Sequence, residues 1–194
     1  GDLTALALLA NTIATGAGLY ALIVTLGPVS GAHFNPVVTL VAALQKQLPW
    51  RDALRYWPAQ ISGAVAGVWL AHAMFERPIW QLSTHIRNGG GQWLAEAVAT
   101  FGLLLIIAST SRYRPAATPA AVATYITSAY WFTASTSFAN PAVTLARSLT
   151  DSFAGIAFMD VPGFVIAQLS GALFALAISH WLLQDNVSPR TRDA

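Results

Sequence analysis

Two copies of an Asn-Pro pair carry the chemistry that this sequence offers. Each pair stands in an apolar chain and opens a similar run: Asn35-Pro36-Val37-Val38-Thr39-Leu40 and Asn140-Pro141-Ala142-Val143-Thr144-Leu145. Asn is a preferred N-cap residue, and Pro suits the first helical turn because its missing N–H needs no partner there. When the Asn oxygen accepts N–H bonds from its own helix, its NH₂ group remains a donor toward a solute. The pairs therefore predict two short helices, over about 35–45 and 140–149, with their Asn side chains lining a pore.

The composition places these helices in a membrane. Of the 194 residues, 55% are hydrophobic and 9% are charged, and the mean hydropathy is +0.55. A soluble domain carries about 25% charged residues. The chain has no Cys, and its four His residues show no metal-binding spacing. We therefore expect no metal, no cofactor and, because the basic residues form no long run, no nucleic-acid partner.

Five apolar stretches are long enough to span a bilayer, which needs about 20 helical residues. They cover roughly 3–26, 53–75, 92–111, 119–139 and 161–183. The two Asn-Pro helices are too short to cross at about 1.5 Å per residue. We expect them to enter the membrane and turn back.

The basic residues predict how the chain is oriented. If the loops alternate between the two sides, one side holds Lys46, Arg51, Arg55, Arg112, Arg114, Arg190 and Arg192, and the other holds Arg77, Arg87 and Arg147. The richer side is cytoplasmic by the positive-inside rule. The first Asn-Pro helix then enters from the cytoplasm and the second from outside, as inverted repeats require.

A second duplicated phrase supports the repeat. Ala59-Gln60-Ile61-Ser62-Gly63-Ala64 recurs as Ala167-Gln168-Leu169-Ser170-Gly171-Ala172. The Asn residues are 105 positions apart (140 − 35) and the Gln residues 108 (168 − 60). A single Asn-Pro pair marks an ordinary loop and helix start, but two copies in register indicate two structural halves. Shifted back by the same offset, the 92–111 span has no counterpart, so a first span is expected to be missing.

The run from Ser30 to Thr39, with Asn140-Pro141-Ala142, resembles the two signature loops of the aquaporin (major intrinsic protein) family. The resemblance implies six spans and two half-helices forming an hourglass pore in each subunit of a homotetramer. The fold class expected here is therefore all-α, with five spans and two re-entrant half-helices. We expect one channel domain over 1–194, with half-repeats at 1–75 and 92–183 and a cytoplasmic tail at 184–194.

The resemblance also implies a selectivity filter near the outside. The family commonly has Arg directly after its second Asn-Pro-Ala, whereas this chain has Val143. The other filter positions fall at Thr15, Ser128 and Ser137, or at Gly16 or Ala129 if the alignment slips by one. All are small, which favours larger polyols and metalloid hydroxides such as arsenite. The run from Ala134 to Leu149 resembles bacterial aquaglyceroporins linked with arsenic handling.

Three further residues are candidates for supporting roles. Glu96 lies in an apolar span; it resembles the family's buried Glu, which holds a re-entrant loop, and proton transfer is the alternative. His33 either orients its loop or lines the cytoplasmic vestibule. Arg147, one helical turn beyond Val143, either extends to the membrane surface or acts as a displaced cation in the vestibule.

The function expected is a passive channel for water and small uncharged solutes such as glycerol, in the bacterial inner membrane. A secondary transporter also uses broken helices, but Glu96 alone is thin support for an ion site. A non-conducting structural subunit is the other alternative. An enzyme is not expected, because no nucleophile, base and orienting group occur together.

Overall fold

The computed structural model describes residues 2–183, and this part of the chain is helical without strands. In chain order the elements are α1 (Asp2–Ser30), α2 (Pro36–Leu44), α3 (Trp50–Met74), α4 (Gly90–Tyr113), η1 (Pro115–Ala117), α5 (Thr118–Phe132), α6 (Pro141–Arg147), η2 (Phe158–Asp160) and α7 (Val161–Leu182). The tail predicted at 184–194 lies outside the described residues, and so do Arg190 and Arg192.

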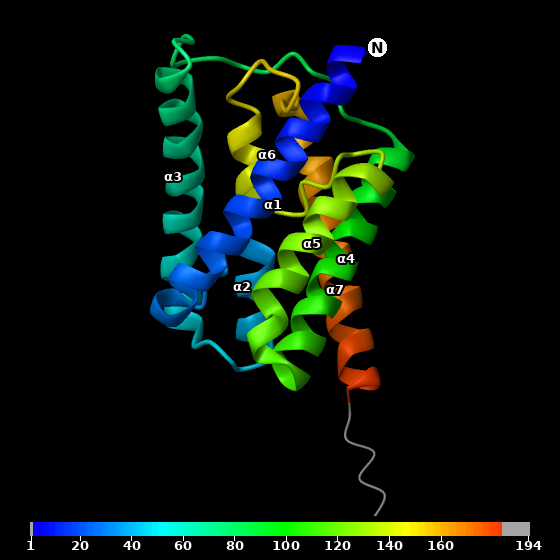
Figure 1. Cartoon of the computed structure of the whole chain (residues 1–194). Helices are drawn as coiled ribbons and strands as arrows, with labels where there is room; N and C mark the ends of the chain where they lie inside the picture. Colours follow the sequence, from blue (N-terminus) through cyan, green and yellow to red (C-terminus); the bar gives the residue numbers. More distant parts are fainter. Residues whose placement is uncertain (1, 184–194) are drawn as a thin grey trace, which may run out of the picture.

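The long helices form a bundle around the two short ones. α4 packs along α7 and α5, and α1 packs on α5. α3 stands at one edge of the bundle, with α2 beside its lower half and α6 beside its upper half (Figure 1). α2 lies toward one end of the bundle and α6 toward the other, and the two half-helices contact each other inside it (Figure 1). This is the arrangement predicted for an inverted repeat.

By length and composition, three helices are able to cross a membrane: Leu3–Ser30, Gly90–Tyr113 and Phe158–Leu182. The sequence predicted five. α3 is long enough at 25 residues, but Arg51, Asp52 and Arg55 in its first turns and polar residues further on lower its hydropathy. α5 has only 15 residues.

The end of α5 differs from the prediction, because the stretch expected to span at 119–139 is helical only to Phe132. Beyond it the backbone is left-handed at Thr136, Ser137 and Ala139, which a helix cannot accommodate. The hydroxyl of Ser135 accepts a bond from the amide of Ser137, a local bond that competes with helix formation. Residues 133–139 therefore form the loop that leads to the second Asn-Pro pair.

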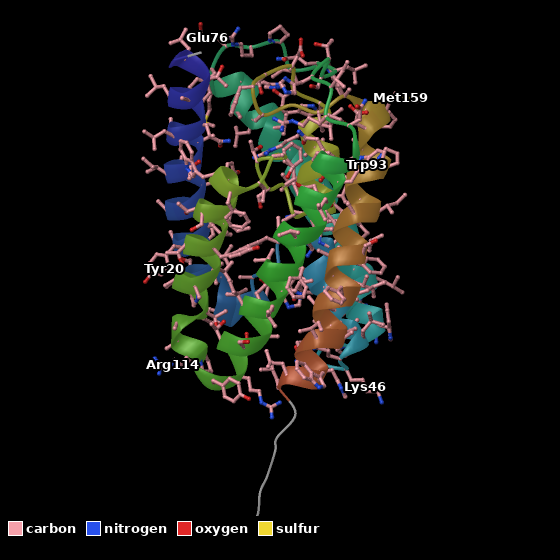
Figure 2. All side chains as sticks on the ribbon, turned by 90° about the vertical axis from the view of Figure 1, so that its right-hand side faces the viewer. Tyr20, Lys46, Glu76, Trp93, Arg114 and Met159 are labelled. Carbon is pink, nitrogen blue, oxygen red and sulfur yellow. The ribbon has the colours of Figure 1, made fainter. Side chains whose placement is uncertain are left out.

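The two ends of the bundle carry different side chains (Figure 2). Lys46 and Arg114 lie at one end, and Glu76, Trp93 and Met159 lie at the other. The sequence analysis assigned Lys46 and Arg114 to the cytoplasmic side, and these two residues do share one end of the molecule. Tyr20 points outward from the middle of the bundle, where a bilayer would surround it.

The half-helix α2 is fixed by apolar packing. Its buried Val37, Val38 and Val41 form one cluster with Leu104 of α4 and with Ala172 and Ala175 of α7. Burying a valine side chain is worth about 1.5–3 kcal/mol. Two long helices therefore hold the short helix at a fixed depth.

Candidate functional site

Both Asn residues cap their half-helices as predicted. Asn35 accepts a bond from the amide of Val37 (3.1 Å), and Asn140 accepts from the amides of Ala142 (3.0 Å) and Val143 (3.3 Å). Each Asn has an extended backbone, and a Pro follows it at the start of the helix. The side-chain oxygen of each Asn is thus occupied, and its NH₂ group is directed away from its own helix.

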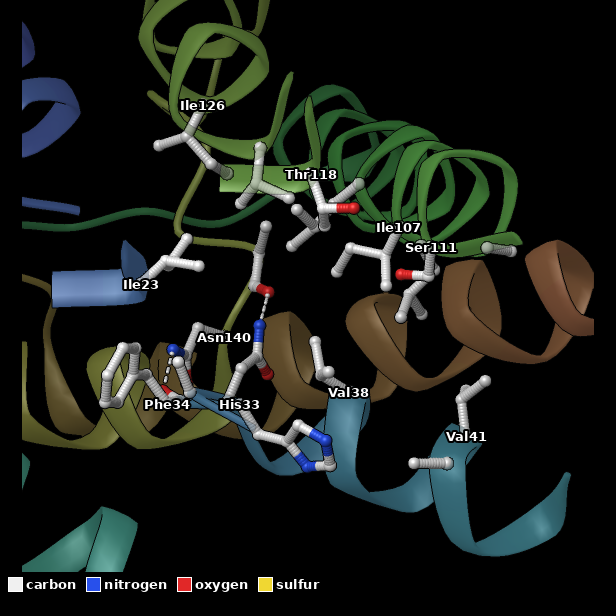
Figure 3. A pocket seen from close by; sticks show the side chains of 18 of the residues that line it. Ile23, His33, Phe34, Val38, Val41, Ile107, Ser111, Thr118, Ile126 and Asn140 are labelled. Atoms are coloured by element: carbon white, nitrogen blue, oxygen red, sulfur yellow. Dashed lines mark hydrogen bonds between the residues drawn. The ribbon is translucent and has the colours of Figure 1, made fainter. Parts of the chain in front are cut away.

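The two NH₂ groups link the loops to each other. Asn35 Nδ2 donates to the carbonyl of Ala139 (2.7 Å), and Asn140 Nδ2 donates to the carbonyl of Phe34 (2.8 Å) (Figure 3). Phe34 and Ala139 both have left-handed backbones, with φ of 47° and 48°. The sequence analysis did not predict these cross-links. One N–H of each NH₂ is used, which leaves one as a donor for a solute.

A cavity of about 1140 Å³ contains both Asn residues in its wall. Figure 3 shows Val38, Val41, Ile107 and Ser111 around one part of it, with Asn140 and Phe34 further in. The wall also includes Thr15, Tyr130, Ser137, Val143 and Arg147 on the side of α6. The cavity therefore extends to both sides of the point where the half-helices meet.

Not all of the residues that the sequence placed along a pore line this cavity. Asn35 and Asn140 do, whereas Pro36, Val37, Pro141 and Ala142 are absent from its wall. Val37 and Ala142 are buried behind it, because the helical turn after each Asn directs them into the bundle.

Ser128 is not where the sequence placed it. Its side chain is exposed, and its hydroxyl bonds the carbonyl of Thr124 within its own helix. α5 presents Val122, Ile126 and Tyr130 to the cavity, a spacing of four that defines one helical face. Ser128 falls between two of these positions and points the other way. The residue that borders the cavity here is Tyr130, which the sequence analysis missed.

The other three predicted filter residues border the cavity. Thr15 Oγ1 lies 3.3 Å from the hydroxyl of Tyr130. Ser137 is buried, and its hydroxyl has no partner among the described residues. Val143 is partly exposed to the cavity. Thr15, Ser137 and Val143 thus all border the cavity that contains the two Asn residues.

Glu96 is fully buried and supports the second loop. Its two carboxylate oxygens accept bonds from the amides of Phe138 (2.8 Å) and Ala139 (2.8 Å). Gln168 Nε2 donates to Glu96 (2.6 Å) and to the hydroxyl of Thr144 (2.8 Å). Glu96 is not part of the cavity wall. These contacts fit a positioning role and offer no route for proton transfer to a solute.

His33 lies at the start of the first loop and lines the cavity. Its Nδ1 is 3.1 Å from the hydroxyl of Thr39, which in turn donates to the carbonyl of Asn35 (3.3 Å). The ring also stands 5.6 Å from that of Tyr56. His33 therefore combines both roles considered for it, since it orients its loop and faces the cavity.

Arg87 is a structural residue that sequence reasoning assigned only to the outer side. Its buried guanidinium donates to the carbonyls of Gly155 (2.7 Å), Ser135 (3.0 Å) and Phe153 (3.1 Å). The pKa of Arg87 falls to about 10, chiefly because burial disfavours its charge and also because Arg147 is positive nearby. Arg87 stays charged at neutral pH and clamps the segment between α3 and α4 onto the segments before and after α6.

The charged side chains that the structure describes in the cavity wall are all basic. None of the described residues in its wall is acidic, while Arg112 and Arg147 are basic. The half-helix start of α2 adds roughly half a positive charge. An entering cation therefore meets repulsion from Arg147 and from the start of α2, whereas a neutral solute does not.

The chain is similar to known proteins of one family. The family profile of the major intrinsic protein matches residues 2–132. Aquaglyceroporin AqpS of Rhizobium meliloti (strain 1021) is 58% identical over 180 residues, which is 93% of this chain and 77% of that protein. Aquaporin NIP2-2 of Zea mays is 34% identical over 173 residues, 84% of this chain and 58% of that protein. Aquaporin-5 of Mus musculus is 36% identical over 118 residues, 56% of this chain and 44% of that protein.

Proposed function

The chain belongs to the major intrinsic protein family, and we propose that it conducts water and small uncharged solutes such as glycerol passively through the cavity at its two Asn-Pro loops. This is a family of multi-pass membrane channels, not of enzymes. The observation that carries the proposal is the pair of Asn residues, which are cross-linked from opposed half-helices and both face the cavity.

The wall of the cavity explains why uncharged solutes are favoured. Aliphatic side chains such as Val38, Val41 and Ile107 dominate one part of it. A polar solute loses hydration there, and the free N–H of each Asn replaces some of it. An ion loses far more, because moving a charge out of water without a partner is very costly. The cavity therefore supports passage of neutral molecules and disfavours ions.

The size of permitted solutes follows from the residues at the external side. Val143, Thr15 and Ser137 are small, so this part admits hydroxylated molecules larger than water. Glycerol is the solute class named by the bacterial relative, an aquaglyceroporin. We extend the proposal to uncharged metalloid hydroxides such as arsenous acid, which also present several hydroxyl groups.

The assembly proposed is a homotetramer in the cell membrane. Large apolar side chains are exposed on the outer faces of the long helices, among them Leu9 and Ile13 of α1 and Ile166 and Phe174 of α7. Some face lipid, and others are available for contact between subunits. Native mass spectrometry in detergent distinguishes a tetramer from a monomer.

The proposal is tested by osmotic shrinkage of proteoliposomes with water, glycerol and arsenous acid as permeants. We expect flux above that of empty vesicles for all three, independent of a proton gradient. Flux that requires the gradient would instead indicate a secondary transporter. No flux at all would indicate a structural subunit.

A single substitution sharpens this test at the external side. Val143→Arg adds a long cation in place of a small side chain of the wall, so glycerol flux should fall by roughly tenfold, while water flux falls less. Val143→Leu is the matched control, since it adds bulk without charge. Equal glycerol flux in Val143→Arg and the parent would exclude Val143 from the narrowest part of the path.

A further inference from the structure

The guanidinium of Arg147 lies against two aromatic rings at the external side of the cavity. Its Cζ is 4.3 Å from the ring centre of Phe138 and 5.9 Å from that of Tyr130. Its Nη2 donates to the hydroxyl of Tyr130 (2.9 Å), and Arg147 is part of the cavity wall. An arginine that extended to the membrane surface would make none of these contacts. The alternative of a displaced cation in the vestibule is the one that the geometry favours.

The hydroxyl of Tyr130 fixes the guanidinium through an ordered chain of hydrogen bonds. Arginine only donates, so the oxygen of Tyr130 accepts from Arg147 and its own hydrogen is free for Thr15 Oγ1, 3.3 Å away. Thr15 in turn donates to Asn11 Oδ1 (3.4 Å). The chain links α6, α5 and α1 across one side of the cavity. Removing the Tyr130 hydroxyl breaks it at its centre.

Two buried polar atoms of residues in the cavity wall have no partner in the described part of the chain. Arg147 Nη1 and Ser137 Oγ are both buried and make no hydrogen bond to the described residues. Both residues belong to the same cavity wall. Buried polar atoms without partners are rare in proteins and call for an explanation such as a water or a ligand. An oxygen atom of a solute in the cavity is one such partner.

We propose that Tyr130 and Arg147 form the specificity-determining pair of the cavity, an inference that rests on the proposed channel function. Val143 leaves its own position without a donor, and Arg147 supplies a guanidinium from one helical turn further out. Tyr130 holds that group so that Nη1, with Ser137 Oγ, binds an oxygen of an uncharged hydroxylated solute. The same positive charge repels cations.

A cysteine reporter measures this charge without depending on flux. The sequence contains no Cys, so Val143→Cys introduces a single thiol one turn from Arg147. Two methanethiosulfonate reagents are applied from outside, one bearing a sulfonate and the other a trimethylammonium group, and modification is followed by mass spectrometry. The ratio of the two rates cancels the intrinsic reactivity of the thiol. It therefore reports the local potential.

We expect the anionic reagent to react faster in the Val143→Cys protein. Adding Arg147→Met should lower the ratio about tenfold, because one charge within a few ångströms is removed. Tyr130→Phe should lower it roughly threefold, since the freed guanidinium swings away, and should have no further effect in the Arg147→Met background. Arg147→Lys keeps the charge, so its ratio should stay within about twofold of the parent.

Arg77→Met is the matched control, because it removes an exposed external arginine that does not line the cavity. The proposal is overturned if Arg147→Met leaves the ratio of the two rates unchanged, or if neither reagent reacts. It is also overturned if Tyr130→Phe lowers the ratio as much in the Arg147→Met variant as it does in the parent. Water and glycerol flux are measured on the same vesicles. If the vesicles conduct but the two reagents react at equal rates, the proposal for Tyr130 and Arg147 is overturned and the channel function stands. If the anionic reagent reacts faster but the vesicles do not conduct, the channel function is overturned and the placement of Arg147 is supported.

Discussion

The two Asn-Pro loops reach the same geometry at their tips with different supports behind them. Each tip has a left-handed residue, Phe34 or Ala139, directly before its capping Asn. Each Asn donates to the carbonyl of the left-handed residue in the opposite loop. The tips thus obey the symmetry of the sequence repeat. The side chains that hold them do not.

The second loop is held by a charged acceptor from a spanning helix. Glu96 accepts two loop amides, and Gln168 connects it to Thr144 of α6. The first loop is held by neutral donors of α3: Tyr56 to the carbonyl of Ser30 (2.8 Å), Trp57 to that of Pro36 (3.2 Å) and Gln60 to the hydroxyl of Thr39 (2.8 Å). Bonds to an ionised group are roughly twice as strong as neutral ones. The second loop is therefore the more firmly anchored of the two.

The repeated Gly shows the same difference at the level of helix packing. A Cβ at Gly171 would collide with the backbone of Ala97, because α7 and α4 are in close contact there. A Cβ at Gly63 or Gly67, on α3, would meet no described atom within 4 Å. Equivalent positions of the repeat thus face a packed helix in one half and open space in the other. A sequence repeat fixes local geometry without fixing the surroundings.

The largest effect is expected from Glu96→Ala, which removes the support specific to the second loop. It leaves the buried amides of Phe138 and Ala139 without partners, removes one of the two acceptors of Gln168, and each unsatisfied donor costs about 1–3 kcal/mol. The free energy of unfolding should fall by roughly 3 kcal/mol or more, with loss of water flux. Thermal unfolding in detergent measures the loss of stability. Glu76→Ala, in an exposed loop, is the control. A wild-type melting temperature for Glu96→Ala would remove the basis of the comparison.

The repeated Gln residues allow the two supports to be compared directly. Gln168→Ala withdraws a donor from a buried carboxylate and should cost about 2–3 kcal/mol, whereas Gln60→Ala withdraws one from a hydroxyl and should cost about 1 kcal/mol. Chemical denaturation of both variants in the same detergent measures the difference. If Gln60→Ala proved the more damaging, the first loop would be the better anchored.

The repeated Gly residues should respond with opposite signs. Gly171→Ala forces α7 away from α4 and should destabilise the protein by about 1–3 kcal/mol. Gly63→Ala adds a methyl group in open space and improves helix propensity, so it should stabilise by up to about 1 kcal/mol. Melting temperatures of the two variants report this contrast, and a shift in the same direction for both would refute it.

The smallest effect concerns the loop between α3 and α4, which is bonded to the segment after α6. Asp151 accepts bonds from the amide (2.9 Å) and hydroxyl (3.0 Å) of Thr84, and these bonds lower the pKa of Asp151, the amide bond most. Because the folded pKa is lowered, this contact is fully present above the unfolded value of 3.8 and is lost as pH falls through the lower folded value. Hydrogen exchange should show that protection of the Thr84 amide declines only as the pH falls below 3.8 and toward the lower folded pKa of Asp151. In Asp151→Asn, protection that still fell with pH would exclude Asp151 as its cause.

The sequence was sufficient for the features that depend on local rules. Cap chemistry predicted the starts of both half-helices, and hydropathy predicted where the long helices lie. Composition alone also placed residues 133–139 in a span, although the Ser and Thr residues there were a signal for a loop. Helix ends of this kind depend on backbone angles that hydropathy does not report.

The features that were missed depend on side-chain direction and long-range contacts. Counting back from Asn140 selected Ser128, whereas the phase of α5 presents Tyr130 to the cavity. Arg87 was assigned to the outer side by charge, but it is buried against three carbonyls from two segments distant in sequence, one before and one after α6. The cross-links between Asn35 and Asn140 and the opposite loops also needed the folded chain.

The measurement that tests the account most directly is a reversible block of the cavity. Val38 lines it one turn beyond Asn35, and Val98 of α4 is exposed on the outer surface. In proteoliposomes, a mercurial should reduce both water and glycerol flux of Val38→Cys to the level of empty vesicles, and a reducing thiol should restore both. Val98→Cys should be unaffected. Flux that continues undiminished through fully modified Val38→Cys protein would show that solutes do not pass between the two Asn-Pro loops.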